Sequence, residues 1–173
     1  MNPFQFSPES ELFAANYSLI EEIEGFWKRD CARCFEELFG AVERGLERTL
    51  TAVVRSNGYR YWWPATSPKD RAVVLWYSTA YIEVLKARKL LWWAYLGEGD
   101  KFPTEAERAS WQGAAVAECR IDGVTLEPVV DGNKYKTLRV EMPWAADPVS
   151  DCAPKIVRVF KELEKARGTA LGV

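Results

Sequence analysis

The amino-acid sequence predicts an α+β fold, and three observations carry this prediction. Apolar residues recur every three or four positions from Ile20 to Val53, which predicts a long N-terminal helix. Asp122-Gly123 and Asp131-Gly132-Asn133 divide residues 117–142 into three short segments, as in a three-stranded antiparallel meander. A second helical spacing over 153–167 predicts a C-terminal helix. Together with a central aromatic-rich segment of helix or strand, these elements are expected to form a single domain over residues 1–173.

The N-terminal part of the chain is predicted to be an arm followed by a long helix. Residues 1–17 form the arm, in which Ser7-Pro8-Glu9 begins a short helical turn. Ser18 and Glu21 have the spacing of a capping box, so the long helix is expected over 19–55, with Asn57-Gly58 as its stop. An unbroken helix of this length measures about 55 Å at about 1.5 Å per residue. Either it kinks at a glycine, or it projects and pairs with a second copy as a homodimer.

The central segment allows two interpretations. Tyr59 to Trp63 has the composition of a strand, and Pro68 follows Ser67 as at the start of a helix. Residues 72–77 and 90–96 also have strand composition, but the residues between them carry the polar face of a helix. The segment is therefore a strand, helix and strand in succession, or one buried helix over 68–96. Because no Gly, Pro, Asn or Asp separates its pieces, the pattern favours the single helix or two helices with a break between them.

The C-terminal part continues with a turn at 97–100 and a helix that begins near Thr104 and carries Trp111. The meander follows, with strands at 117–121, 124–130 and 134–142. Its last strand alternates, which predicts that Leu138, Val140 and Met142 are buried. Residues 143–150 are expected to be a loop and 168–173 a frayed tail. The closing helix over 153–167 is predicted to bury four side chains, those of Ile156, Val159, Phe160 and Leu163.

Composition excludes several classes of function. The 173 residues contain no histidine, so the chain cannot build a Ser-His-Asp or Cys-His relay or a histidine metal triad. A net charge of −2 argues against a nucleic-acid partner, because proteins that bind nucleic acids normally carry a basic stripe. No segment has the roughly 18 or more apolar residues that span a bilayer, and the N-terminus lacks the pattern of a signal peptide. We therefore expect no membrane partner, a cytoplasmic location and reduced cysteines.

Metal and cofactor sites are not predicted. Cys31-Ala-Arg-Cys34 has a metal-binding spacing, and Cys119 and Cys152 would complete a set of four thiolates. However, Cys31 and Cys34 fall on the apolar side of the predicted long helix. Buried structural cysteines explain this better. Glu118, Asp122 and Glu127 lie close in sequence, although alternation and turn chemistry account for them. A carboxylate-based, metal-dependent hydrolase stays an alternative.

The most distinctive feature of the composition is its eight tryptophans. An unusually aromatic core is one interpretation. The other is a binding surface, because Trp and Tyr supply large, rigid contact areas. The candidate binding residues are Arg60, Trp62, Trp63, Trp76, Tyr77, Tyr81, Trp92, Trp93 and Tyr95.

With no catalytic residue to name, the sequence favours a non-enzymatic protein-interaction module over an enzyme. An inhibitor, an immunity protein or an accessory regulator would fit, acting through the aromatic surface on a protein partner. One alternative is a small-molecule-binding protein whose pocket is walled by four aromatic residues, Trp62, Trp76, Trp92 and Tyr95. The other alternative is the hydrolase described above.

Overall fold

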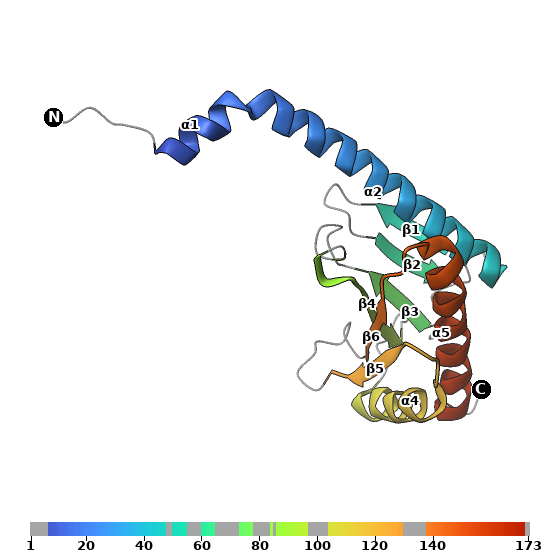
Figure 1. Ribbon diagram of the computed structural model, residues 1–173. Coiled ribbons are helices and arrows are strands. Elements are labelled where there is room, and N and C mark those ends of the chain that lie inside the picture. Colours follow the sequence, from blue (N-terminus) through green and yellow to red (C-terminus); the bar gives the residue numbers. More distant parts are fainter. Residues whose placement is uncertain are drawn as a thin grey trace. The chain divides into compact units, whose positions relative to one another are not determined.

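The computed structural model describes residues 7–47, 50–54, 60–64, 73–77, 84, 86–96, 104–129 and 138–171. The chain divides into two compact units, Met1–Phe35 and Glu36–Val173, and the boundary falls inside helix α2. Helices combined with an antiparallel sheet confirm the α+β class (Figure 1). The elements are α1 (Pro8–Ala15), α2 (Tyr17–Leu46), β1 (Leu50–Val54), β2 (Arg60–Pro64), β3 (Val73–Tyr77), β4 (Lys89–Leu96), α4 (Glu105–Glu118), β5 (Thr125–Pro128), β6 (Leu138–Pro143) and α5 (Pro148–Leu171).

The N-terminal unit contains α1 and the first part of α2. The side chain of Ser7 accepts a hydrogen bond from the backbone N–H of Ser10 at 3.2 Å, which confirms the predicted helix start. The capping box predicted at Ser18 is wrong, because α2 begins at Tyr17 and Ser18 lies inside it. The backbone N–H of Ile20 instead donates to the carbonyl of Asn16, the residue that ends α1.

The long helix is confirmed, but it ends at Leu46 and does not reach residue 55. Glu47 follows with φ of 52°, so a left-handed residue that is not glycine ends the helix. The apolar spacing that suggested helix beyond this point belongs to β1, where Thr51 and Val53 are β-branched. The predicted stop at Asn57-Gly58 lies outside the described residues.

The C-terminal unit contains a six-stranded sheet in the order β1-β2-β3-β4-β6-β5, and each neighbouring pair is antiparallel. Strand β2 confirms the prediction for 59–63, apart from its first residue. The single helix over 68–96 is wrong, since β3 and β4 flank helical residues at 86–87, as in the alternative interpretation. Arg88 makes the turn into β4 with φ of 54°. No glycine marks this turn, which is why the sequence favoured one helix. The helix start at Pro68 and the turn at 97–100 lie outside the described residues.

The predicted meander is only partly right. Helix α4 is capped by Thr104 and continues to Glu118, so 117–121 is not a strand. Asp122-Gly123 is a turn, as predicted, but it joins α4 to β5: Val124 N–H donates to the Ile121 carbonyl at 3.0 Å, and only Gly123 has positive φ (72°). A two-residue hairpin of type I′ needs positive φ at both central residues, so this geometry is that of a type II turn. The pairing of β5 with β6 is antiparallel, and Asp131-Gly132-Asn133 lies outside the described residues.

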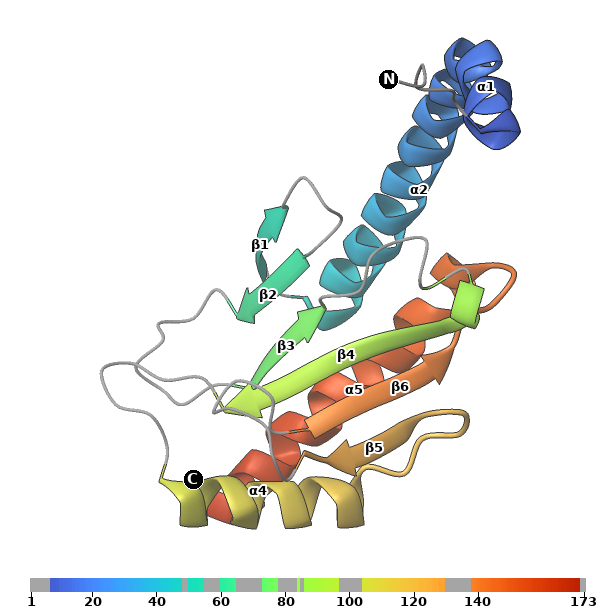
Figure 2. The ribbon, with the colours of Figure 1, turned by 90° about the vertical axis from the view of Figure 1, so that its left-hand side faces the viewer.

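Helix α5 lies along one face of the sheet (Figure 2). It begins at Pro148, inside the predicted loop: Asp147 accepts from the Ser150 N–H at 3.1 Å, which is the Asp-Pro signature of a helix start. It also includes residues 168–171, which were expected to fray. The carboxylate of Glu164 accepts from the Val73 N–H at 3.1 Å and so ties α5 to β3. The side chains predicted to be buried on α5 and β6 are buried, namely Ile156, Val159, Phe160, Leu163, Leu138, Val140 and Met142.

Candidate interaction surfaces

The structure places eight of the nine predicted binding residues on three neighbouring strands. Arg60, Trp62 and Trp63 lie on β2, and Trp76 and Tyr77 lie on β3. Strand β4 carries the remaining three, Trp92, Trp93 and Tyr95. Tyr81 lies outside the described residues. Sequence reasoning therefore identified one aromatic region, although it did not identify the strands that would bring it together.

The register divides these positions between the two faces of the sheet. Paired residues of an antiparallel sheet share a face, and successive residues alternate. Tyr77 pairs with both Arg60 and Trp92, whereas Trp76 pairs with Trp93. One face, which we call the helix-covered face, therefore includes the positions of Arg60, Trp62, Tyr77 and Trp92. The second face includes those of Trp63, Trp76, Trp93 and Tyr95. A pocket walled jointly by Trp62, Trp76, Trp92 and Tyr95 would need residues from both faces.

Trp92 belongs to the core. Its side chain is 1% exposed, and its ring meets that of Phe39 edge-on, with centroids 5.8 Å apart. Phe39 lies on the part of α2 that belongs to the C-terminal unit. Tyr95 is also buried, at 5% exposure, although its position is on the second face. A partner cannot reach either side chain in this structure, which corrects their assignment to a surface.

The second face carries half-buried apolar side chains beside a charged cluster. Leu91 and Trp93 on β4 are each partly exposed and are paired with Glu141 and Arg139 of β6. Glu141 forms ion pairs with Lys89 and with Arg139, the latter at 2.8 Å. Arg139 also reaches Glu127 of β5, at 3.7 Å. We call Lys89, Glu141, Arg139 and Glu127 the charged cluster.

The charges around Glu141 lower its pKa. The hydrogen bond from Lys89 is the largest cause, and the charges of Lys89 and Arg139 add to it against the opposing effect of burial. The carboxylate is therefore ionised over the whole neutral range. The oxygens of this ionised carboxylate already accept hydrogen bonds from two cations. Glu141 is therefore suited to linking β4 and β6 through ion pairs and poorly suited to proton transfer.

Most of the exposed large hydrophobic side chains that the structure describes lie elsewhere, in the N-terminal unit. Eight large hydrophobic side chains are exposed among the described residues, and seven of them lie between positions 12 and 26, at 36–67% exposure. The eighth, Val116, is on α4. We call the seven the apolar stripe: Leu12, Phe13, Tyr17, Leu19, Ile20, Ile23 and Phe26. The spacing of Ile20 and Ile23 predicts one side of a helix, but neither side chain is buried here.

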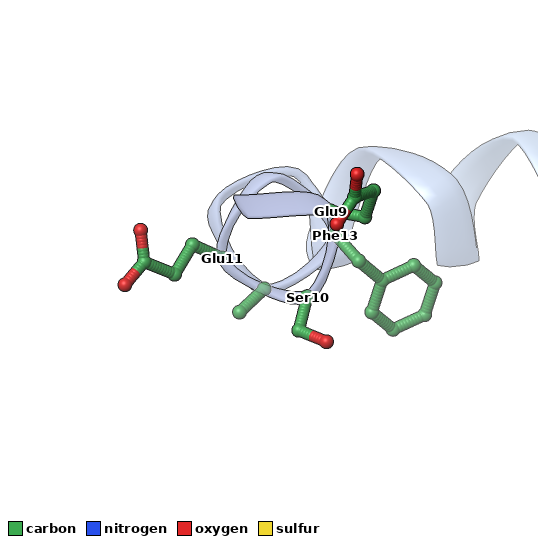
Figure 3. Close-up of a pocket in the computed structure, with 5 residues that line it drawn as sticks. Glu9, Ser10, Glu11 and Phe13 are labelled. Carbon is green, nitrogen blue, oxygen red and sulfur yellow. The ribbon is translucent and has the colours of Figure 1, made fainter. Parts of the chain in front are cut away.

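A shallow pocket lies on α1 and is lined by Glu9, Ser10, Glu11, Phe13 and Ala14. Figure 3 shows the labelled side chains pointing away from the helix in different directions, without converging on a common point. Small-molecule sites bring a few polar groups together in an apolar cavity. This pocket lacks that arrangement, and we interpret it as part of the exposed surface around Phe13.

The surroundings of three thiols, those of Cys31, Cys119 and Cys152, disfavour the thiolate form. Burial is the main cause that raises the pKa of Cys31 and of Cys119, each to about 11, and it also raises the pKa of Cys152. The thiolate is the form that binds zinc or attacks an electrophile, so these thiols are poorly prepared for either role at neutral pH. Across the part of the chain that the structure describes, no three His, Cys, Asp or Glu side chains gather as a metal site would require.

Comparisons with protein-family models, with curated proteins and with solved structures found no match. None of the described helices combines the length and the hydropathy needed to cross a membrane. Function must therefore be inferred from the residues of this chain.

Proposed function

We propose that the chain is a non-enzymatic protein-interaction module, of the inhibitor, immunity-protein or accessory-regulator type, and that its contact surface is the apolar stripe. The observation that carries the proposal is the concentration of seven exposed large hydrophobic side chains within positions 12–26. Single exposed apolar side chains are ordinary, but a contiguous group of them marks a surface that is covered by a partner.

The proposal moves the contact surface from the sheet to the helical N-terminal unit. Of the aromatic residues first considered, Trp93 is the one with a described, partly exposed side chain. Its neighbours Arg139 and Glu141 are already held in the charged cluster. A role for the second face as an additional contact stays a prediction.

The two alternatives have less support. A pocket of Trp62, Trp76, Trp92 and Tyr95 would have to draw on both faces of one sheet. The hydrolase would use Glu118, Asp122 and Glu127, but Glu118 ends α4, Asp122 lies in the following turn, and Glu127 is paired with Arg139. Divalent cations need several oxygen ligands around one point.

The test compares proteins captured by the immobilised full-length chain and by two variants. Ile23→Glu places a charge in the apolar stripe, whereas Ser18→Glu places the same charge on an exposed polar position of the same helix. We expect the wild type and Ser18→Glu to retain the same partner protein and Ile23→Glu to lose it. That partner can be a second copy of the chain. Equal retention by all three proteins, or no retention by any, would contradict the proposal.

A further inference from the structure

We infer that the apolar stripe is covered by the apolar stripe of a second copy of this chain, with the two helices antiparallel. This inference rests on the proposed function, because it names the partner of the proposed surface. It also restricts the contact region of the homodimer, which was expected along the helix over 19–55, to the first part of that helix. Leu38, which lies farther along the same helix, is completely buried and cannot meet a second copy.

The apolar stripe has the geometry of a helix-pairing seam. Leu19, Ile20, Ile23 and Phe26 recur at spacings of three and four residues, which places them on one side of α2. Trp27, which is mostly buried but partly exposed, lies on the same side, four residues after Ile23. At the break between the helices, the rings of Phe13 and Tyr17 meet edge-on with centroids 5.7 Å apart, so two exposed aromatic side chains join α1 to the first turn of α2.

The total exposed area of the apolar stripe is comparable with one side of a dimer interface. Seven large side chains that are each about half exposed, with on the order of 200 Å² apiece, present roughly 700 Å² per copy. A standard protein interface buries about 800 Å² on each partner. The side of α2 that carries Leu19, Ile23 and Phe26 would supply the centre of such an interface, and neighbouring side chains would supply the rest.

The charges favour the antiparallel orientation. Every charged residue among the first 27 is acidic, and these are Glu9, Glu11, Glu21, Glu22 and Glu24. Lys28 and Arg29 then follow at the other end of the apolar stripe. A parallel pair would bring acidic end against acidic end and basic against basic. An antiparallel pair brings the Glu9 and Glu11 end of one copy toward the Lys28 and Arg29 end of the other.

Arg29, at the basic end of the apolar stripe, lies against the last apolar side chain. The Arg29 guanidinium lies over the Phe26 ring, 4.6 Å from its centroid, and Lys28 pairs with Glu24 at 2.6 Å. The Arg29 cation therefore stays beside the last apolar side chain, where an acidic partner end would meet it, whereas Lys28 lies on another side of the helix, in its pair with Glu24. A lipid surface fits less well, because helices that lie on membranes carry Lys and Arg on the polar face, whereas this one carries mostly glutamate.

Sedimentation velocity over a range of protein concentrations tests the pairing. We expect a dimer for the wild type and for Ser18→Glu, and a folded monomer for Ile23→Glu, with a dissociation constant raised at least about hundredfold because both copies bury the new charge. Circular dichroism of each variant confirms that the helices and the sheet are retained. A wild type that is monomeric up to high micromolar concentration would overturn the inference.

A charge-reversal cycle tests the orientation. Reversing one end, with Glu9→Lys and Glu11→Lys together, or with Lys28→Glu and Arg29→Glu together, should weaken the dimer at least about tenfold. Reversing both ends should restore it, because opposite charges face each other again. A parallel dimer would respond little to each change and would show no restoration. Such a result would overturn the antiparallel arrangement.

The two proposals fail in different ways. If the wild type is monomeric but captures another protein that Ile23→Glu loses, a second copy is the wrong occupant and the interaction function stands. If the wild type neither dimerises nor captures a protein through the apolar stripe, both proposals fail. Binding of the wild type to vesicles of anionic lipid, lost in Ile23→Glu, would replace both with a membrane-surface role.

Discussion

The two ends of α2 carry similar amphipathic patterns and meet opposite surroundings. Ile23 and Phe26, near its start, are 58% and 53% exposed, whereas Leu38 and Phe39, near its end, are 0% and 1% exposed. Apolar periodicity states which side chains share one side of a helix. It does not state what covers that side. In the C-terminal unit the sheet and α5 cover that side, and in the N-terminal unit the apolar side chains stay exposed among the described residues.

The largest expected effect compares two phenylalanines of this helix. Phe39→Ala should lower the free energy of unfolding by about 3–5 kcal/mol, because it leaves a cavity in the core and removes the edge-on contact with Trp92. Phe26→Ala should change it by less than about 0.5 kcal/mol when measured at a concentration where the chain is monomeric. Urea unfolding followed by tryptophan fluorescence measures both. Equal losses would mean that the first part of α2 is buried within the monomer.

The second effect compares a capping box that exists with one that only the sequence suggested. Thr104 accepts from the Glu107 N–H at 3.2 Å, and the Glu107 carboxylate accepts from the Thr104 N–H at 2.7 Å. Thr104→Ala should therefore cost about 1 kcal/mol. Ser18→Ala should cost nothing, because Ser18 lies inside α2 and alanine is the better helix former. Thermal unfolding distinguishes them, and a comparable loss in Ser18→Ala would restore the predicted helix start.

These cases show which parts of the fold the sequence specifies. The alternation of apolar and polar residues over 138–142 correctly predicted the buried face of β6, and the three- and four-residue spacing around Ile156 and Phe160 correctly predicted that of α5. In both cases the pattern fits the local secondary structure, and the apolar side is covered by another element of the fold. Boundaries were predicted less well where a residue other than glycine adopts a left-handed conformation. Glu47 ends α2 and Arg88 begins β4 in this way, and neither residue type signals a turn.

The candidate surface was harder to predict than the fold. Trp92 and Trp93 are neighbours in the sequence, but one is packed against Phe39 and the other is partly exposed beside the charged cluster. Composition identifies such residues without indicating which face each one occupies, since that depends on the strand register. The apolar stripe could be read as amphipathic from its spacing. That it lacks a cover within the described chain became visible only once exposure was known.

An effect of similar size, but of opposite sign at the two ends of α2, is expected for its glycines. A Cβ atom at Gly45 would lie 2.7 Å from Cγ2 of Val157, a short, stiff side chain on α5. Gly45→Ala should therefore destabilise the protein by about 1 kcal/mol or more, since overpacking outweighs helix propensity. At Gly25 a Cβ atom would meet nothing within 4 Å, so Gly25→Ala should stabilise the helix by about 0.5–1 kcal/mol. Urea midpoints measure both, and stabilisation by Gly45→Ala would contradict the close approach of the two helices.

The smallest effect concerns the charged cluster of the sheet, where the contribution of Glu141 depends on pH. Its pKa is lowered in the folded protein from an ordinary value of 4.5, chiefly by the hydrogen bond from Lys89, so the folded state binds the proton less readily than the unfolded chain. The stabilisation is therefore fully present above the unfolded pKa and is lost as the pH falls through the lower folded pKa.

Glu141→Gln should cost a few tenths to about 1 kcal/mol at pH 7, because the cluster is partly exposed and screened. The difference between wild type and variant should narrow by pH 3, and Glu127→Gln, in the more distant pair with Arg139, should cost less. A difference that stays constant between pH 7 and pH 3 would show that Glu141 acts through its shape and not through its charge.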